Sequence, residues 1–98
     1  MASTNEGLVK LEIKKLFKKH NVWYCMPMGT GYGKSGVPDF LACVNGKFLA
    51  VEAKAGKGTT TALQERELAA IIASGGSAIV VNEHNLNELE ALLWTHSV

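Results

Sequence analysis

The chain has 98 residues, of which 47% are hydrophobic and 19% are charged, and its formal net charge is +1. These values predict one globular domain over residues 1–98 and exclude a disordered or low-complexity chain. No apolar run approaches the ~20 residues that a membrane-spanning helix needs, and the first residues lack the apolar segment of a signal peptide. We therefore expect an intracellular, cytoplasmic protein that does not contact a membrane.

The first predicted element is a helix from about Thr4 to His20. Ser3 and Glu6 have the spacing of a capping box, in which each side chain bonds the backbone N–H of the other residue. An apolar stripe at helical spacing is expected to face the core, and lysines lie mostly off that stripe. The stripe consists of Val9, Ile13, Leu16 and Phe17, and the lysines are Lys10, Lys14, Lys15, Lys18 and Lys19.

A short strand from Val22 to Met26 follows, and Pro27 ends it because proline has no N–H for a strand ladder. The next segment, Gly29 to Gly36, is rich in glycine and predicts a loop. Its spacing Gly31-x-Gly33-x-x-Gly36 matches a dinucleotide-binding fingerprint, but Val37-Pro38 stands where that fingerprint requires a helix. We expect no nucleotide cofactor.

A β-hairpin is the clearest local prediction. Asn45-Gly46 separates the apolar runs 39–44 and 47–53, and this dipeptide is typical of two-residue hairpin turns. A two-residue turn fixes the register of the two strands. Counting back from the turn places Asp39 opposite Glu52.

The second half of the chain predicts a helix, a strand and a last helix. Thr61 and Gln64 have capping-box spacing at the start of a helix that runs to about Ala73, and Gly75-Gly76 ends it. Residues 78–81 are continuously apolar, which is typical of a strand buried on both faces. A right-handed crossover from the hairpin to this strand predicts an α/β fold, a mixed β-sheet flanked by helices. The middle helix has an apolar side made of Leu63, Leu68, Ile71 and Ile72.

Three further residues are expected in the core. Trp23 and Trp94 are more often buried than used to stack on nucleic-acid bases. Cys43 lies within an apolar strand run, where a buried free thiol is the usual state. Cys25 is the other cysteine of the sequence, and two cysteines do not make a disulfide framework.

The pairing of Asp39 with Glu52 requires a cation. Opposite side chains on a hairpin lie roughly 5 Å apart at Cβ, so two carboxylates there repel each other unless a positive charge lies between them. Lys54 lies two residues beyond Glu52 and therefore on the same face of the strand. Two acids, a lysine and Mg²⁺ suit phosphodiester hydrolysis. In the alternative interpretation, Asp39 only follows a proline turn, and Glu52 and Lys54 face solvent.

The segments Gly36-Val37-Pro38-Asp39 and Val51-Glu52-Ala53-Lys54 resemble the PD-(D/E)xK signature of restriction-endonuclease-like nucleases. Together with Glu6 on the first helix and Gln64 at the start of a later one, nearly the whole chain resembles the virus-type replication-repair nuclease (VRR-NUC) family. The resemblance implies a restriction-endonuclease-like core and a Mg²⁺- or Mn²⁺-dependent DNA endonuclease. Stand-alone members of the family are associated with homodimers and with branched DNA such as Holliday junctions, so we expect both here.

The resemblance also implies roles for the residues around the hairpin. Asp39 and Glu52 would bind the metal ion together with the carbonyl group of Ala53, and Lys54 would be the catalytic lysine. Gln64 would hydrogen-bond this lysine or the attacking water, or it could serve only in the capping box with Thr61.

Glu6 is the expected acid of the first helix, where it would orient a water or a lysine near the metal ion. It shares the stripe of Val9, Ile13 and Phe17, whereas Glu12 is rotated off that stripe and is the second choice. The alternative for Glu6 is a role in the capping box alone.

Contacts with nucleic acid are expected from lysines of the first helix and from the glycine loop. A solvated helix face and a plain connecting loop are the alternatives. A non-catalytic nucleic-acid-binding module on the same fold is the second function that we consider, and an α/β interaction domain is the third. The candidates for contact are Lys10, Lys14, Tyr32 and Lys34, and the expected apolar patch for a dimer is Leu92, Leu93 and Trp94.

Overall fold

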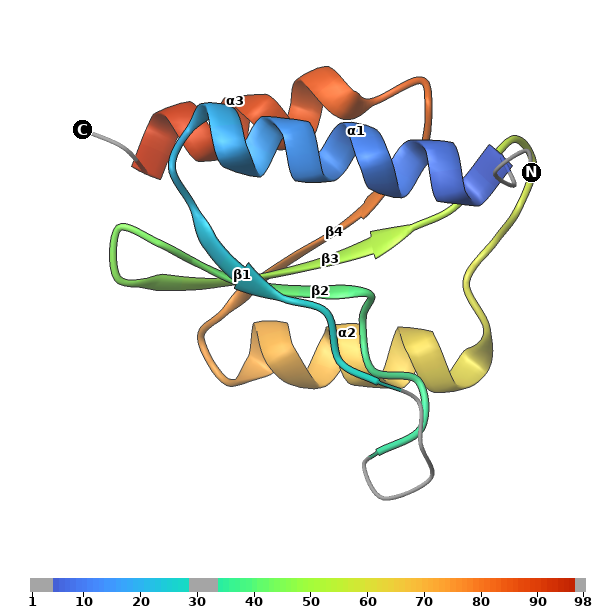
Figure 1. Ribbon diagram of the computed structural model, residues 1–98. Helices are drawn as coiled ribbons and strands as arrows, with labels where there is room; N and C mark the ends of the chain where they lie inside the picture. The colour runs from blue at the N-terminus through green and yellow to red at the C-terminus, as the bar shows by residue number, and fades with distance from the viewer. Residues whose placement is uncertain (1–4, 29–33, 97–98) are drawn as a thin grey trace.

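A four-stranded β-sheet lies at the centre of the structure, and helices cover both of its faces (Figure 1). The computed structural model describes residues 5–28 and 34–96 of the chain. The elements are α1 (Asn5–Lys19), β1 (Trp23–Cys25), β2 (Phe40–Val44), β3 (Lys47–Ala53), α2 (Ala62–Ala73), β4 (Ser77–Val81) and α3 (Leu86–His96). The strands lie in the order β1-β2-β3-β4, and the sheet is mixed. The predicted α/β class is therefore confirmed.

The hairpin forms in the predicted register. Asn45 and Gly46 have φ values of 51° and 80°, as a type I′ turn requires. β2 and β3 pair antiparallel from this turn to Phe40 opposite Val51. Asp39 lies one residue beyond this last pair, at the end of the sheet.

The crossover also forms as predicted, since β3 and β4 pair in parallel and α2 connects them. However, β4 is an edge strand, and the side chain of Val80 is exposed. The prediction that this strand is buried on both faces is wrong, because α2 leaves part of its outer face open.

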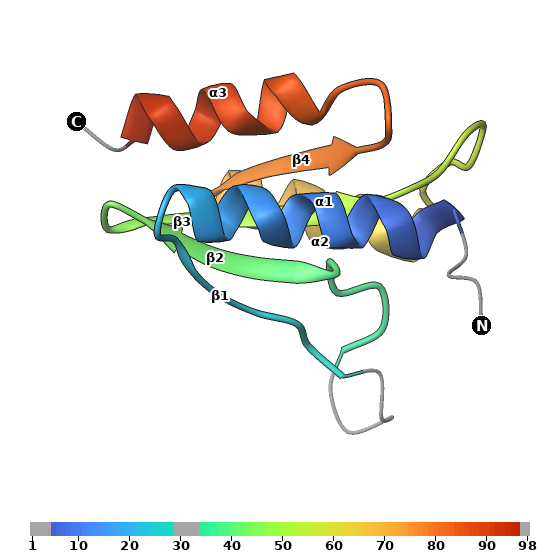
Figure 2. The same cartoon turned by 45° about the horizontal axis from the view of Figure 1, so that its top comes forward.

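The hydrophobic core lies between the sheet and the helices α1 and α3, which cover the same face (Figure 2). The predicted stripe of α1 is confirmed, since Val9, Ile13 and Phe17 are buried. Leu93 is fully buried as well, so its predicted place in an exposed dimer patch is wrong. The sheet and α3 contribute Phe40, Ala42, Val44, Leu49, Val51, Ala53, Val81 and Leu89.

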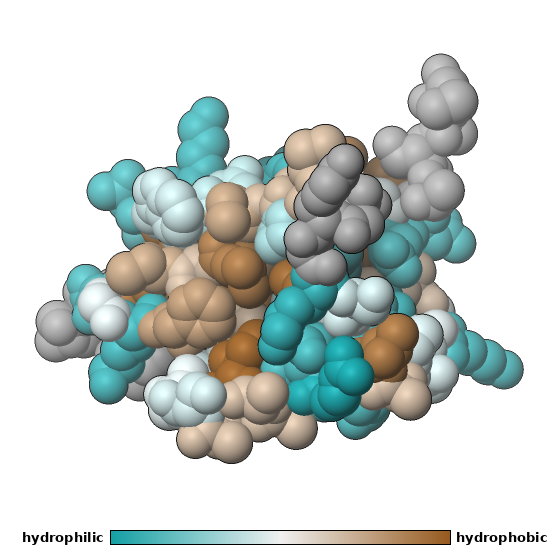
Figure 3. Space-filling view, turned by 90° about the horizontal axis from the view of Figure 1, so that it is seen from below, coloured by the Kyte–Doolittle hydropathy of each residue, from teal (hydrophilic) through white to brown (hydrophobic). Residues whose placement is uncertain are grey.

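The opposite face of the sheet is covered by α2 alone. Among the residues of this helix only Glu67 is buried, whereas Leu63 and Ile72 are exposed. The apolar side predicted for α2 is therefore only partly covered. Figure 3 views the molecule from this side and shows apolar side chains gathered between hydrophilic ones.

The three residues expected in the core are exposed. Trp23 keeps 66% and Trp94 keeps 58% of its surface accessible, and Cys43 is exposed. On β2, Phe40 and Ala42 occupy the core-facing positions, so the period of two turns Cys43 to the other face. Trp23 is the partner of Cys43 in the β1–β2 ladder and shares that face.

All three helices begin at the same end of the sheet, where β3 and β4 finish (Figure 1). Their N-terminal backbone N–H groups give this end of the molecule partial positive charge. None of the helices in the described ranges is long and apolar enough to cross a membrane.

Candidate active site

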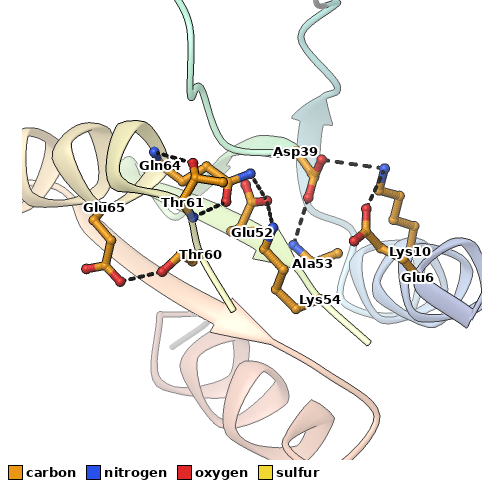
Figure 4. A network of polar contacts seen from close by, with 10 residues as sticks. All are labelled: Glu6, Lys10, Asp39, Glu52, Ala53, Lys54, Thr60, Thr61, Gln64 and Glu65. Atoms are coloured by element: carbon orange, nitrogen blue, oxygen red, sulfur yellow. Dashed lines mark hydrogen bonds and ion pairs between the residues drawn. The ribbon is translucent and has the colours of Figure 1, made fainter. Parts of the chain in front are cut away.

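Five of the predicted site residues gather at the end of the sheet where β3 finishes and α2 begins (Figure 4). Glu52 and Ala53 are the last residues of β3, and Lys54 follows them directly. Asp39 immediately precedes β2, and Gln64 lies in the first turn of α2. The turn at Asn45-Gly46 and the capping box thus bring residues from three parts of the chain together.

Asp39 joins the sheet to α1. Its Oδ2 atom accepts a hydrogen bond of 2.8 Å from the backbone N–H of Ala53. Its Oδ1 atom lies 3.5 Å from Nζ of Lys10, and the same Nζ lies 3.6 Å from Oε2 of Glu6. Lys10 therefore balances one carboxylate from the helix and one from the end of the sheet.

Glu52 is a buried carboxylate with only one of its oxygens engaged. The residue is 2% exposed. Its Oε2 atom accepts a 2.9 Å hydrogen bond from Nε2 of Gln64 and lies 3.5 Å from Nζ of Lys54. Its Oε1 atom is buried and has no hydrogen-bond partner among the described residues. The alternative that Glu52 faces solvent is therefore wrong.

The electrostatics of Glu52 reflect this position. Burial and then the negative charge of Asp39 raise the pKa of Glu52 from 4.5 to about 7, while Lys54 acts in the opposite direction. The two carboxylates are thus close enough to interact, as the hairpin register predicts. A buried carboxylate beside another one is stabilised either by a proton or by a cation.

Gln64 fills the capping role that was considered for it, and its remaining side-chain hydrogen bond goes to Glu52 and not to the predicted partner Lys54. Its backbone N–H donates to Oγ1 of Thr61 at 3.2 Å, and its Oε1 accepts from the N–H of Thr61 at 2.9 Å. The capping box at the start of α2 is therefore confirmed. The box fixes the amide oxygen and so leaves Nε2 to donate to Glu52.

The oxygen atoms of this site fit a hard divalent cation. Carboxylate oxygens are the ligands that Mg²⁺ prefers, and Oε1 of Glu52 is a buried acceptor that lacks a partner in the described chain. Within residues 5–28 and 34–96, no group of three or more His, Cys, Asp or Glu side chains is placed to hold a metal ion. The remaining ligands would therefore be water and a backbone oxygen, for which the carbonyl group of Ala53 is the prediction.

The two acids of α1 have different surroundings. Glu6 belongs to the site only through Lys10. Glu12 pairs with Lys15 at 3.0 Å on the exposed side of the helix and does not join the site. The structure thus places Glu6, and not Glu12, near the acidic pair of Asp39 and Glu52.

The loop candidates lie outside the cluster. Lys34 is 3.4 Å from Glu67 of α2 and mostly exposed, and Tyr32 lies outside the described residues. Ser3, the predicted capping partner of Glu6, is also outside them. Lys14 lies one helical turn beyond Lys10 and has no ion pair in the described chain.

Two residues behind the site were not predicted to matter. Gly36 has a φ of 80°, and a Cβ atom there would lie 2.6 Å from the backbone of Leu63 and 2.9 Å from N of Gln64. The segment that leads to Asp39 therefore packs directly on the first turn of α2. Glu67, the other residue, is buried on this helix, and its position three residues after Gln64 was the available signal.

Comparison with known proteins identifies no relative: no family model matches the chain, and neither a curated protein nor a solved structure is significantly similar to it. What the site can do therefore follows from its own residues and their geometry.

Proposed function

We propose that this protein is a divalent-metal-dependent endodeoxyribonuclease with a restriction-endonuclease-like core, as the resemblance to the VRR-NUC family implies. The observation that carries the proposal is the buried carboxylate of Glu52. It lies beside Asp39 and 3.5 Å from Lys54, and one of its oxygens has no partner in the described chain. A surface that only binds nucleic acid gains nothing from two adjacent acids, because they repel phosphate.

The residues divide the proposed work between them. Asp39, Glu52 and the carbonyl group of Ala53 would hold Mg²⁺ or Mn²⁺, which lowers the pKa of a bound water and offsets charge on the phosphate. The ammonium group of Lys54 is then placed to orient the attacking water or to stabilise charge on a phosphate oxygen. Gln64 donates to Oε2 of Glu52 and leaves Oε1 available.

The helix α1 contributes to the site through an ion pair with Asp39. Lys10 lies 3.5 Å from this carboxylate and offsets part of its negative charge. Glu6 holds Lys10 from the other side. In this proposal Glu6 positions a lysine next to the metal ligand and does not itself bind the metal.

We further propose that the substrate is branched DNA and that the enzyme is a homodimer. A two-fold symmetric dimer presents two sites to two symmetry-related strands, which suits a four-way junction. Since Leu93 is buried, the dimer contact is better supported on the α2 side, where Phe48, Ile72 and Val80 are exposed.

Cleavage of matched DNA substrates tests the proposed activity. Labelled four-way, flap and linear DNA of the same sequence are incubated with Mg²⁺ or with EDTA. Lys54→Ala should slow cleavage by about 10²–10³-fold, the usual effect of removing one group that stabilises the transition state. Lys57→Ala removes an exposed lysine three residues away and should cleave as the wild type does. Equal cleavage by both variants contradicts the role of Lys54. Binding without any cleavage by the wild type favours the non-catalytic module.

Calorimetric titration with Mn²⁺ tests the proposed ligands separately. Asp39→Ala should abolish binding. Glu12→Ala removes an acid that lies outside the site and should leave binding unchanged. Wild-type protein that binds no Mn²⁺ refutes the metal site.

A further inference from the structure

A hollow lies between α1 and β1, away from the acidic pair of Asp39 and Glu52. It has a volume of about 460 Å³, which is in the range of roughly 300–1,000 Å³ that ligand sites occupy. Figure 2 shows α1 passing over this edge of the sheet. Its lining combines the apolar residues Leu11, Phe17, Val22 and Tyr24 with the polar residues Lys14, Lys15, Lys18 and Asn21.

Two of the lysines at this hollow carry uncompensated charge. Lys15 pairs with Glu12 at 3.0 Å, whereas Lys14 and Lys18 form no ion pair within residues 5–28 and 34–96. Unpaired cations beside an apolar hollow are complementary to a ligand that has both anionic and flat apolar parts. Nucleotides have this combination of phosphate and base.

The lysines continue along α1 from the candidate active site. Lys10, Lys14 and Lys18 follow one another at intervals of four residues, so they line one side of the helix at steps of about 6 Å. The first of them lies 3.5 Å from Asp39. The charge of Lys10 is already balanced by Glu6 and Asp39. A chain of phosphates that runs from the acidic pair to the hollow would therefore meet the positive charges of Lys14 and Lys18.

The apolar part of the hollow favours unpaired bases. Tyr24 lines it, and the ring of this residue packs against Phe17 and Phe40, with ring centroids 4.9 Å and 5.7 Å away. Bases stack on such rings when they are not paired, and a base inside a duplex cannot reach them.

The hollow and the lysines that line it form one groove. We propose that this groove binds a single-stranded segment of nucleic acid beside the cleavage site, with phosphates on Lys14 and Lys18 and a base in the hollow. The inference rests on the proposed function, and among branched DNA molecules it favours those with an unpaired arm next to the cut over a fully paired four-way junction.

Fluorescence anisotropy of a labelled single-stranded oligonucleotide in EDTA tests the groove without cleavage. Each phosphate contact on a single strand contributes about fivefold to affinity at 0.1 M salt relative to 1 M. Lys14→Gln and Lys18→Gln should therefore each weaken binding by about fivefold, and each should lower the salt slope by about 0.7. Lys47→Gln, which removes a lysine outside the groove, should change neither quantity.

A matched pair of leucines tests the hollow itself. Leu8 and Leu11 are both exposed on α1, but only Leu11 lines the groove. Leu11→Glu should weaken binding of the oligonucleotide, and Leu8→Glu should leave it unchanged.

The outcomes separate this inference from the proposed nuclease activity. Loss of binding in the groove variants supports the groove even if the wild type cuts no DNA, in which case only the proposed activity fails. If the wild type cleaves DNA but single-strand binding does not change in the variants, the groove is overturned and the proposed activity is not. These variants are Lys14→Gln, Lys18→Gln and Leu11→Glu. If the same variants weaken binding of an intact duplex as much as binding of the single strand, the preference for single strands is overturned. Binding to phosphatidylserine vesicles, but not to the oligonucleotide, through the same lysines overturns the proposal in favour of a membrane surface.

Discussion

The proton on Glu52 should make the stability of the metal-free protein fall as pH rises. Burial and the charge of Asp39 raise the pKa of Glu52 from 4.5 to about 7 in the folded protein. Between these two values the folded state binds more protons than the unfolded state, so unfolding becomes easier with increasing pH. The stabilisation is complete below pH 4.5 and is lost as the pH passes through 7.

The size of the effect follows from the two pKa values. At ~1.4 kcal/mol per pH unit, the full difference corresponds to about 3 kcal/mol, most of which is lost between pH 5 and pH 8. Because Asp39 and Glu52 interact, this free energy belongs to the titration of the pair.

Urea unfolding at pH 5 and pH 8 in EDTA measures the effect in the wild type and in Glu52→Gln. The amide keeps the shape of the side chain and an acceptor for Gln64, but it does not titrate. Between pH 5 and pH 8 the unfolding free energy should therefore fall by about 2–3 kcal/mol more in the wild type than in Glu52→Gln. Titrating groups that do not interact with Glu52 cancel in this comparison.

Addition of metal at pH 8 completes the experiment. Mg²⁺ at 100 times its dissociation constant should restore about 2.7 kcal/mol to the wild type and much less to Glu52→Gln. If the two proteins lose stability equally between pH 5 and pH 8, the carboxylate is not held as a buried group beside Asp39, and the reasoning about the site is refuted.

Two further predictions concern the contact between the Asp39 segment and α2. In urea unfolding, Gly36→Ala should lower the unfolding free energy by about 2–4 kcal/mol, because the new Cβ lies 2.6 Å from Leu63 and the residue must also keep a positive φ. Gly46→Ala is the control: no atom lies within 4 Å of its new Cβ, so it should cost only about 1–2 kcal/mol. Equal losses in the two variants would contradict the close packing at Gly36. Thr61→Ala removes the cap of α2 and should lower the unfolding free energy by about 1 kcal/mol. It should also reduce the rate of DNA cleavage. Unchanged unfolding and cleavage would show that the cap does not hold Gln64 in place.

The parts of the site that were predictable depend on local rules. The turn at Asn45-Gly46 sets the register of the hairpin, because its backbone conformation allows only one pairing of the adjacent strands. The capping box of Thr61 and Gln64 is equally local. The turn and the two-residue period of a strand sufficed to predict that Asp39 lies near Glu52, and the capping box predicted the start of α2 at Gln64.

The unpredicted parts depend on how the layers meet. Lys10 reaches Asp39 only because α1 begins at the end of the sheet that β3 reaches, and no sequence spacing fixes that arrangement. The apolar residues of β4 indicated a strand buried on both faces, but its place at the edge exposes Val80. Trp23 and Trp94 are exposed for a related reason, since hydrophobicity does not tell which positions a neighbouring layer covers.

The candidate site is built partly on α2, which buries less apolar surface against the sheet than α1 and α3 do. Most of the buried apolar residues join α1 and α3 to the sheet, whereas α2 buries only Glu67 among its own residues. Segments with few buried apolar contacts open locally at a lower free energy than the whole domain. Local opening of α2 is therefore expected to require less free energy than unfolding of the whole domain, and it would separate Gln64 from Glu52 while α1 and α3 stay packed on the sheet.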